Sequence, residues 1–271
     1  MQTRGPSAEA LTALRDRLDA GLADVGSRKA AQVGDELFSL AVLVRSTPSL
    51  RRVLTDVSVE GSAKAALARD LFGGKVDELT LEVVADAVSR RWTATRDLAD
   101  TVERLAEVAV VRSAGDHVDR VVDELFAVSQ TIDGSPDLRA ALADPARSAE
   151  DRSGLVDGLF GDRVLAATGT LVKQSLSAGY RSVGVALEEY QKVAAGIRDE
   201  NVARVRVAQD LTDDDRARLE QALRRQYGRA VHLNVVVEPS LMGGMRVEIG
   251  DDVIDGTVVA RLDEARRKLA G

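Results

Sequence analysis

The sequence predicts a mainly helical protein that ends in a small α+β domain, and three observations lead to this fold class. Only 3% of its 271 residues are aromatic while 45% are hydrophobic, and small apolar side chains allow helices to pack closely. An internal repeat in the first two thirds of the chain preserves apolar residues at helical spacing. From Asn201 onward, short segments alternate apolar and polar residues with the period of two that is typical of β-strands.

The repeat matches residues 35–76 with residues 123–164 without a gap, so that each residue is paired with the one 88 positions later. Both segments begin with DELF, contain a proline at the same position and share the sequence LFG. Each copy therefore predicts a helix through DELF, a short helix after the proline, a helix that ends at Phe-Gly and a further apolar helix. The alignment also pairs Trp92 with Tyr180, which we interpret as packing anchors.

Residues 95–112 align with the last helix of the first copy and also with the first helix of the second copy. We therefore expect tandem helical bundles that share this helix. The predicted domains are a first helical unit at residues 1–94, a second helical unit at residues 95–200 and a small α+β domain at residues 201–271.

The C-terminal domain is expected to have the element order β-α-β-β-α. Three strands are predicted, at residues 205–207, 231–237 and 245–249. The helix between the first two strands begins after Thr212, a typical N-cap residue, and ends before Gly228. Residues 255–271 predict a final helix that carries basic residues in its last turns.

The segment PSLMGGMRVEIGDDVIDGTVVARL, residues 239–262, raises the question of a phosphate or metal site. We interpret it as turns: two adjacent glycines form a bulge where a strand begins, a third forms a hairpin turn, and an Asp or Thr caps the final helix. A phosphate docked on the amides of that helix is the alternative. The residues on which this interpretation depends are Gly243, Gly244, Gly250, Asp255 and Gly256.

No pattern in the sequence predicts a catalytic residue, a cofactor or a bound metal. The chain has no cysteine, none of its six lysines precedes Ser or Thr as in a phosphate-binding loop, and no GxGxxG motif is present. The acidic segment DLTDDDRARLEQ lacks the glycine and the glutamate of a calcium loop and favours a helix cap. The two histidines, His117 and His232, are expected to face solvent.

Charge and hydropathy argue against several classes of partner. The formal net charge of -7 repels nucleic acid. No stretch approaches the roughly 20 apolar residues of a membrane span, and no N-terminal segment has the pattern of a secretion signal. The absence of cysteine favours a reducing compartment. We expect a cytoplasmic protein that binds no nucleic acid and does not insert into a membrane.

The segment SLMGGMRVEIGDDVIDGTVVARLDEARRKL resembles the C-terminal signature of the ATP synthase delta subunit family, which is related to the mitochondrial oligomycin sensitivity-conferring protein. The second copy of the repeat resembles the N-terminal helical domain of the same family, so the likeness covers roughly residues 95–271. The additional first copy resembles the extended form of delta subunits from high-GC Gram-positive bacteria.

The resemblance implies a non-catalytic subunit of the peripheral stalk, or stator, of the proton-translocating ATP synthase. Such a subunit clamps the catalytic head to the b-type stalk and resists rotor torque during ATP synthesis. The implied partners are the N-terminal helices of the alpha subunits and the b-type stalk subunit, at the inner face of the cell membrane. Two alternatives are a helical-repeat scaffold of an unrelated complex and a phosphate-binding enzyme that uses the C-terminal glycine loops.

Apolar stripes on the predicted helices are the candidate partner surfaces, because amphipathic helices bind in apolar grooves. For each residue, the alternative is a place in the core of the chain itself. The candidates for contact with the head are Leu11, Leu14, Leu18, Leu22, Val102, Leu105 and Ala109. The candidates for contact with the stalk are Leu262, Ala265 and Leu269.

Overall fold

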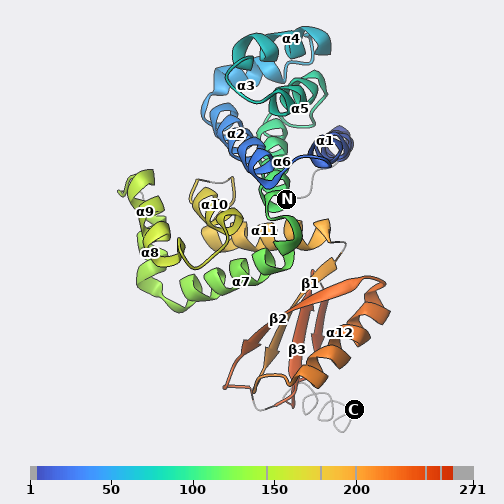
Figure 1. The fold of residues 1–271 in the computed structure, drawn as a ribbon, viewed down its shortest axis with the longest axis vertical. Coiled ribbons are helices and arrows are strands. Elements are labelled where there is room, and N and C mark those ends of the chain that lie inside the picture. The colour runs from blue at the N-terminus through green and yellow to red at the C-terminus, as the bar shows by residue number, and fades with distance from the viewer. Residues whose placement is uncertain are drawn as a thin grey trace, which may run out of the picture. The chain divides into compact units, whose positions relative to one another are not determined.

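The computed structural model describes residues 5–144, 146–177, 179–198, 200–241, 243–250 and 252–258. The chain divides into two compact units, Met1–Val193 and Ala194–Gly271. The first unit is helical and the second contains a four-stranded sheet (Figure 1). The predicted fold class, mainly α with a small α+β domain, is confirmed. None of the helices in the described residues is long and apolar enough to cross a membrane.

The helical unit contains two sets of helices whose limits recur with the repeat. The first set is α1 (Pro6–Leu22), α2 (Ser27–Ser46), α3 (Pro48–Leu54), α4 (Gly61–Phe72), α5 (Glu78–Ser89) and α6 (Asp97–Ser113). After a short 3-10 turn, the second set is α7 (Val118–Gly134), α8 (Pro136–Ala143), α9 (Ala149–Phe160), α10 (Ala166–Gln174) and α11 (Val183–Ile197). Pro48 and Pro136 each start a short helix, because proline fits the first helical position, where no amide is needed.

Helix α6 packs against α1, α2 and α5 of the first set and against α7 and α10 of the second set. Its side chains are buried around much of its circumference, from Leu98 to Val111. The same helix therefore contributes to the core of both copies (Figure 1). The division of the helical unit between residues 94 and 95 stays a prediction.

A glutamate in the DELF motif explains why both copies keep this sequence. Glu36 on α2 accepts a hydrogen bond from the backbone N–H of Asp77 at 2.9 Å and another from the hydroxyl of Thr80 at 2.6 Å. Asp77 is the N-cap residue of α5, so a carboxylate from α2 satisfies donors that a helix leaves unpaired at its N-terminus. This contact ties α2 to α5.

The second copy repeats this arrangement 88 positions later. Glu124 on α7 accepts from the backbone N–H of Leu165 at 2.8 Å and from the hydroxyl of Thr168 at 2.6 Å, at the N-terminus of α10. The other carboxylate oxygen binds the side chain four residues earlier in each copy, Gln32 or Arg120. The glutamate therefore holds the same pair of helices together in both copies.

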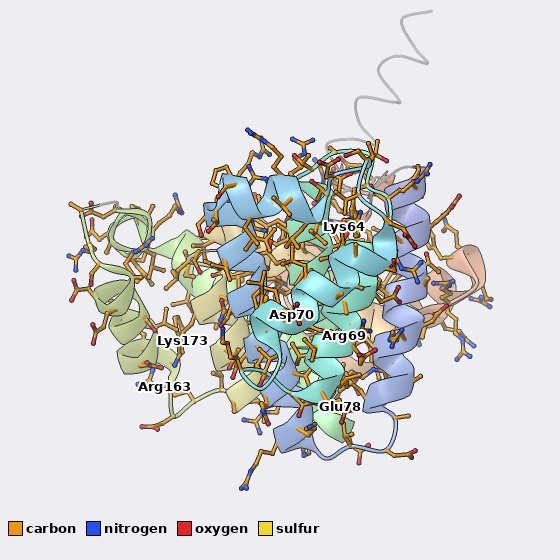
Figure 2. All side chains as sticks on the ribbon, turned by 90° about the horizontal axis from the view of Figure 1, so that it is seen from above. Lys64, Arg69, Asp70, Glu78, Arg163 and Lys173 are labelled. Atoms are coloured by element: carbon orange, nitrogen blue, oxygen red, sulfur yellow. The ribbon has the colours of Figure 1, made fainter. Side chains whose placement is uncertain are left out.

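A cation also recurs at equivalent positions, buried in the first copy and half-buried in the second. Lys64 on α4 (Figure 2) is 3% exposed, and its ammonium group lies 3.5 Å from the carbonyl of Arg90, which ends α5. Burial lowers the pKa of Lys64. In the second copy Arg152 donates to the carbonyl of Leu176, just after α10, at 3.3 Å. Both cations lie at a helix C-terminus, where unpaired carbonyls carry partial negative charge.

The second unit is built on a mixed sheet. Its described elements are β1 (Glu200–Val207), α12 (Asp213–Tyr227), β2 (Ala230–Val237), β3 (Met245–Ile249) and β4 (Asp252–Asp255). The strand order is β2-β1-β3-β4, with β1 parallel to β2 and the other two pairs antiparallel. Alternate residues of β1, β2 and β3 form the core with Leu223 of α12.

The two residues predicted to mark the ends of α12 have the expected roles. The side chain of Thr212 caps α12 by accepting from the N–H of Asp215, and Gly228 ends the helix in the left-handed conformation with φ 72°. The three predicted strands lie within β1, β2 and β3. The fourth strand, β4, was not predicted, because its residues fall where we expected a turn and the start of the last helix. That final helix lies outside the described residues.

The glycine-rich segment serves the turns around β3. Gly243 and Gly244 have φ values of 126° and 81°. A side chain at Gly244 would place its Cβ 2.4 Å from the carbonyl oxygen of Gly256, so two backbone segments meet here closely. Gly250 lies between β3 and β4 with φ 57°. Asp255 accepts from the N–H and the hydroxyl of Thr257. These backbone contacts favour turns over a phosphate loop.

Candidate partner-binding site

The described candidate residues for contact with the head lie mostly in the core. Leu14, Leu18 and Leu22 on α1 are buried, with exposed fractions of 7% or less. Burial is equally complete at the candidates on α6, which are Val102, Leu105 and Ala109. These six residues therefore lie in the core of the chain itself, which was the alternative to a partner surface. Their contact with the head stays a prediction. Leu262, Ala265 and Leu269 lie outside the described residues.

Leu11 differs from the other candidates because it is half-buried and lines a cavity. The cavity has a volume of about 100 Å³. Its lining comes from three parts of the helical unit: α1, the first half of α6 and the segment just before α11. The lining residues are Leu11, Asp100, Thr101, Glu103, Arg104, Gly179 and Tyr180. We call it the α6 cavity.

An ion-pair network lies beside this cavity. Arg45 on α2 places its guanidinium 2.5 Å from the carboxylate of Glu103 and 3.3 Å from that of Asp100. The backbone N–H of Gly179 donates to Glu103 at 3.1 Å. A Cβ at position 179 would lie 2.7 Å from the guanidinium of Arg45. Glycine therefore allows the segment before α11 to approach the Arg45–Glu103 pair.

A second set of polar groups is centred on Glu107, one turn further along α6. Glu107 is fully buried and accepts from the hydroxyl of Tyr180 at 2.7 Å and from the guanidinium of Arg104 at 2.8 Å. Arg104 also lies 3.8 Å from the carboxylate of Glu189 on α11. The ring of Tyr180 packs edge-on against that of Tyr190, with centroids 5.9 Å apart.

Burial dominates the electrostatics of these carboxylates. It raises the pKa of Asp100 and of Glu103, although Arg45 favours their ionised forms. Burial also raises the pKa of Glu107 to about 7, against the attraction of Arg104 and the hydrogen bond from Tyr180. The environment thus disfavours full negative charge on each of the three acids.

Among the residues that the structure describes, the buried polar atoms without a hydrogen-bond partner in this region include the hydroxyls of Thr101 and Tyr190 and Nη1 of Arg45. Thr101 lines the cavity, is 2% exposed, and its hydroxyl is unpaired. The hydroxyl of Tyr190 is also unpaired in a side chain that is 0% exposed. Buried polar groups are usually paired. The cavity therefore offers the carboxylate oxygens of Asp100 and Glu103 and the hydroxyl of Thr101 as hydrogen-bond acceptors.

This site was not predicted from the sequence, where Tyr180 was interpreted only as a packing anchor, like Trp92 in the first copy. Trp92 donates to the carbonyl of Ala87, within its own copy, whereas Tyr180 reaches Glu107. One signal was present in the sequence: Glu107 falls within the apolar run AEVAVV of residues 106–111, where a carboxylate requires a partner.

The two histidines do not contribute to the site. His117 is exposed in the turn before α7, and His232 is half-buried on β2. Among the described residues, no group of three or more His, Cys, Asp or Glu side chains could hold a metal ion.

The fold and the site define a helical-repeat protein with a small mixed-sheet domain and a polar cavity in its helical unit. A family model described as "ATP synthase delta (OSCP) subunit" matches residues 105–269. The chain is 53% identical to the ATP synthase subunit delta of Nocardioides sp. strain JS614, over 99% of this chain and 97% of the relative. The ATP synthase delta (OSCP) subunit family is therefore the family to which this chain belongs.

Other relatives show the same full-length likeness. The chain is 44% identical to the ATP synthase subunit delta of Kineococcus radiotolerans, with 98% of each chain covered. It is 42% identical to that of Streptomyces avermitilis, with 100% of each chain covered. The family model begins at residue 105, whereas these relatives also match the first copy of the repeat. The additional first copy is thus shared with them.

Proposed function

We propose that this chain is the stator subunit of the proton-translocating ATP synthase that clamps the catalytic head to the b-type peripheral stalk. The observation that carries this proposal is the likeness over the whole chain to proteins named ATP synthase subunit delta, at up to 53% identity among the relatives described above. The division into a helical unit and a small mixed-sheet unit suits a connector with two different partners.

In this role the helical unit binds the N-terminal helices of the alpha subunits, and the C-terminal unit binds the b-type subunit. The complex holds the chain at the inner face of the cell membrane. Helices bind well in grooves between other helices. When several such contacts are linked, the release of one leaves the others in place, so the clamp as a whole dissociates slowly. The chain itself carries no catalytic residue and binds no cofactor.

Rotor torque requires a connector that does not unfold under load. Helix α6 supports this role because it packs against helices of both copies. The carboxylates of Glu36 and Glu124 add a repeated clasp between helices within each copy. A load applied to one copy is therefore passed to the other through a shared, buried helix.

The first test is co-sedimentation of the full chain with catalytic heads stripped of their own delta subunit, with and without the alpha N-terminal segments. We expect binding that disappears when those segments are removed. A folded chain that fails to bind intact heads in the presence of its stalk subunit would contradict the proposal and favour a scaffold of another complex.

Two leucine variants separate a surface role from a core role. Leu11→Asp changes a half-buried residue, and we expect weaker head binding with unchanged helical circular dichroism. Leu14→Asp places a charge at a position that is 0% exposed, so we expect loss of helical signal before any specific effect on binding. If Leu11→Asp bound heads as tightly as the parent chain, Leu11 would not be part of the interface.

A further inference from the structure

The α6 cavity has an excess of carboxylate over cationic groups. Asp100 and Glu103 line the cavity and share the guanidinium of Arg45. Glu107 is not part of the lining and pairs with Arg104. The carboxylate of Glu189 lies near Arg104 as well. Each of the three acids is held by an arginine, yet the set retains a surplus of negative charge when all are ionised. An additional cation at this point would therefore be favoured electrostatically.

The hydrogen-bonding groups of the cavity also favour a donor. The hydroxyl of Thr101 is buried and unpaired at the cavity wall. Asp100 and Glu103 present carboxylate oxygens beside it, since both line the same cavity. Charge-assisted hydrogen bonds to such oxygens are stronger than neutral ones. A cationic group with several N–H donors would use both the charge and the unpaired hydroxyl.

The size and access of the cavity suit one small group. Its volume of about 100 Å³ exceeds the ~30 Å³ that one water molecule occupies in the liquid. Its floor is buried at Thr101 and Glu103, while Gly179 at its edge is exposed and Leu11 is half-buried. A side chain can therefore enter past Leu11 while its end group reaches the buried acceptors.

The first copy of the repeat does not carry this site. At the positions 88 residues earlier, Glu103 is matched by Arg15 and Gly179 by Arg91. The pairing of a buried carboxylate with a glycine N–H is thus lost, and positive charge replaces it. The two copies differ in their binding chemistry although they share a fold.

From this geometry we propose that the α6 cavity is a receptor for one ammonium or guanidinium group, presented by a Lys or Arg side chain of the helix that docks on the helical unit. This inference rests on the proposed function for the identity of the docking helix. The cavity then makes the helical unit selective for a helix with a cation near its contact with Leu11.

The cavity itself is tested with n-butylammonium as a probe and the amide of Gly179 as a reporter, because that N–H donates to Glu103. We expect the amide resonance of the full chain to shift saturably in NMR titrations at constant ionic strength. Tetramethylammonium has the same charge but no N–H donor, and we expect it to cause no saturable shift. Absence of a saturable shift with n-butylammonium would overturn the proposal.

Three isosteric variants give the controls. Asp100→Asn removes charge at the cavity and Thr101→Val removes the unpaired hydroxyl, whereas Asp16→Asn removes the charge of an exposed carboxylate on α1. We expect Asp100→Asn to weaken n-butylammonium binding about tenfold, Thr101→Val to weaken it less, and Asp16→Asn to leave it unchanged. Equal effects of Asp100→Asn and Asp16→Asn would show that n-butylammonium responds only to the general surface charge of the chain, and this result would contradict the proposed site.

The source of the cation is tested with the catalytic heads. We expect Asp100→Asn to weaken head binding relative to Asp16→Asn, with both variants equally helical. If n-butylammonium binds but the heads bind Asp100→Asn as tightly as the parent chain, the assignment to a side chain of the head is wrong. If the parent chain itself does not bind heads, the proposed function is wrong. The n-butylammonium titration still shows whether the cavity binds an ammonium group.

Discussion

Replacing Glu107 by Gln should make the helical unit less sensitive to pH. Glu107 is fully buried, and burial raises its pKa from 4.5 to about 7. Glutamine has the same shape and keeps an oxygen that accepts the hydrogen bond of Tyr180, but it does not titrate. The two chains therefore differ in one buried ionisation.

The size of the effect follows from the pKa difference between the folded and the unfolded chain. Below about pH 4.5 the carboxyl is protonated in both states and contributes no pH dependence. As the pH rises toward about 7, the unfolded chain ionises while the folded chain keeps its proton, so the free energy of unfolding falls. One pKa unit corresponds to about 1.4 kcal/mol, which gives a loss of about 3 kcal/mol for the shift from 4.5 to about 7.

Several charged and titratable groups face Glu107, and the variant leaves all of them in place. On α6 these are Glu103 and Arg104, and on the other elements they are Tyr180 and Tyr190. Their own titrations are common to both chains and cancel in the difference between them. Loss of the Arg104 contact adds a constant cost to the variant, because an amide does not pair with a guanidinium as a carboxylate does.

The assay is urea unfolding of both chains between about pH 5 and pH 8, followed by the fluorescence of Trp92. Trp92 is the chain's one tryptophan and is buried in the helical unit. We expect the stability of Glu107→Gln relative to the parent chain to improve by about 2.5 kcal/mol across this range, because part of the loss in the parent chain is already present at about pH 5. Glu150→Gln, at an exposed carboxylate on α9, should show a constant difference. If the stability difference between Glu107→Gln and the parent chain also stayed constant with pH, the reasoning that burial raises the pKa of Glu107 would be refuted.

Four further substitutions test contacts that only folding creates. Gly179→Ala should lower the stability of the helical unit by no more than about 1 kcal/mol, because its Cβ meets only the ends of the Arg45 and Glu103 side chains, which can shift; a larger loss would show that these two side chains are held rigidly. Glu124→Ala should cost about 2 kcal/mol through the lost hydrogen bonds at the start of α10, measured by urea unfolding, and Glu36→Ala should cost a similar amount if the two copies are equivalent. Gly244→Ala should destabilise the sheet unit by at least about 1 kcal/mol, because a Cβ at this position meets the backbone of Gly256. We expect faster hydrogen exchange of the β3 amides in the variant. Unchanged protection of these amides would contradict the close approach of the two backbone segments.

The positions of the helices could be predicted because their signals are local. Pro48 and Pro136 mark helix starts through a fixed backbone angle, and Thr212 and Gly228 mark the two ends of α12. Strand β4 escaped prediction because four residues with two acids carry no clear period. It forms because β3 offers it a free edge to pair with.

Local sequence signals could not predict the candidate site. The hydroxyl of Tyr180 meets a carboxylate 73 residues earlier in the chain, and the amide of Gly179 meets one 76 residues earlier. Neither partner is suggested by spacing: Glu103 looks like an ordinary solvent-facing residue of an amphipathic helix, and the apolar run around Glu107 indicates burial without indicating the partner. Similarly, the leucines of α1 look like a binding stripe, and only packing against other helices shows that most are buried.

The sequence by itself determined the helical class, the repeat, the small C-terminal sheet and the family likeness, because periodicity, caps and motifs depend on residues a few positions apart. Tertiary structure alone decided which side chains of α6 are buried, which carboxylates share a cavity and which parts of the two copies line that cavity. The physical reason is that burial and charge pairing depend on neighbours brought together from α1, α2, α6 and the segment before α11. Two nearly matching copies can therefore fold alike and still differ in what they bind.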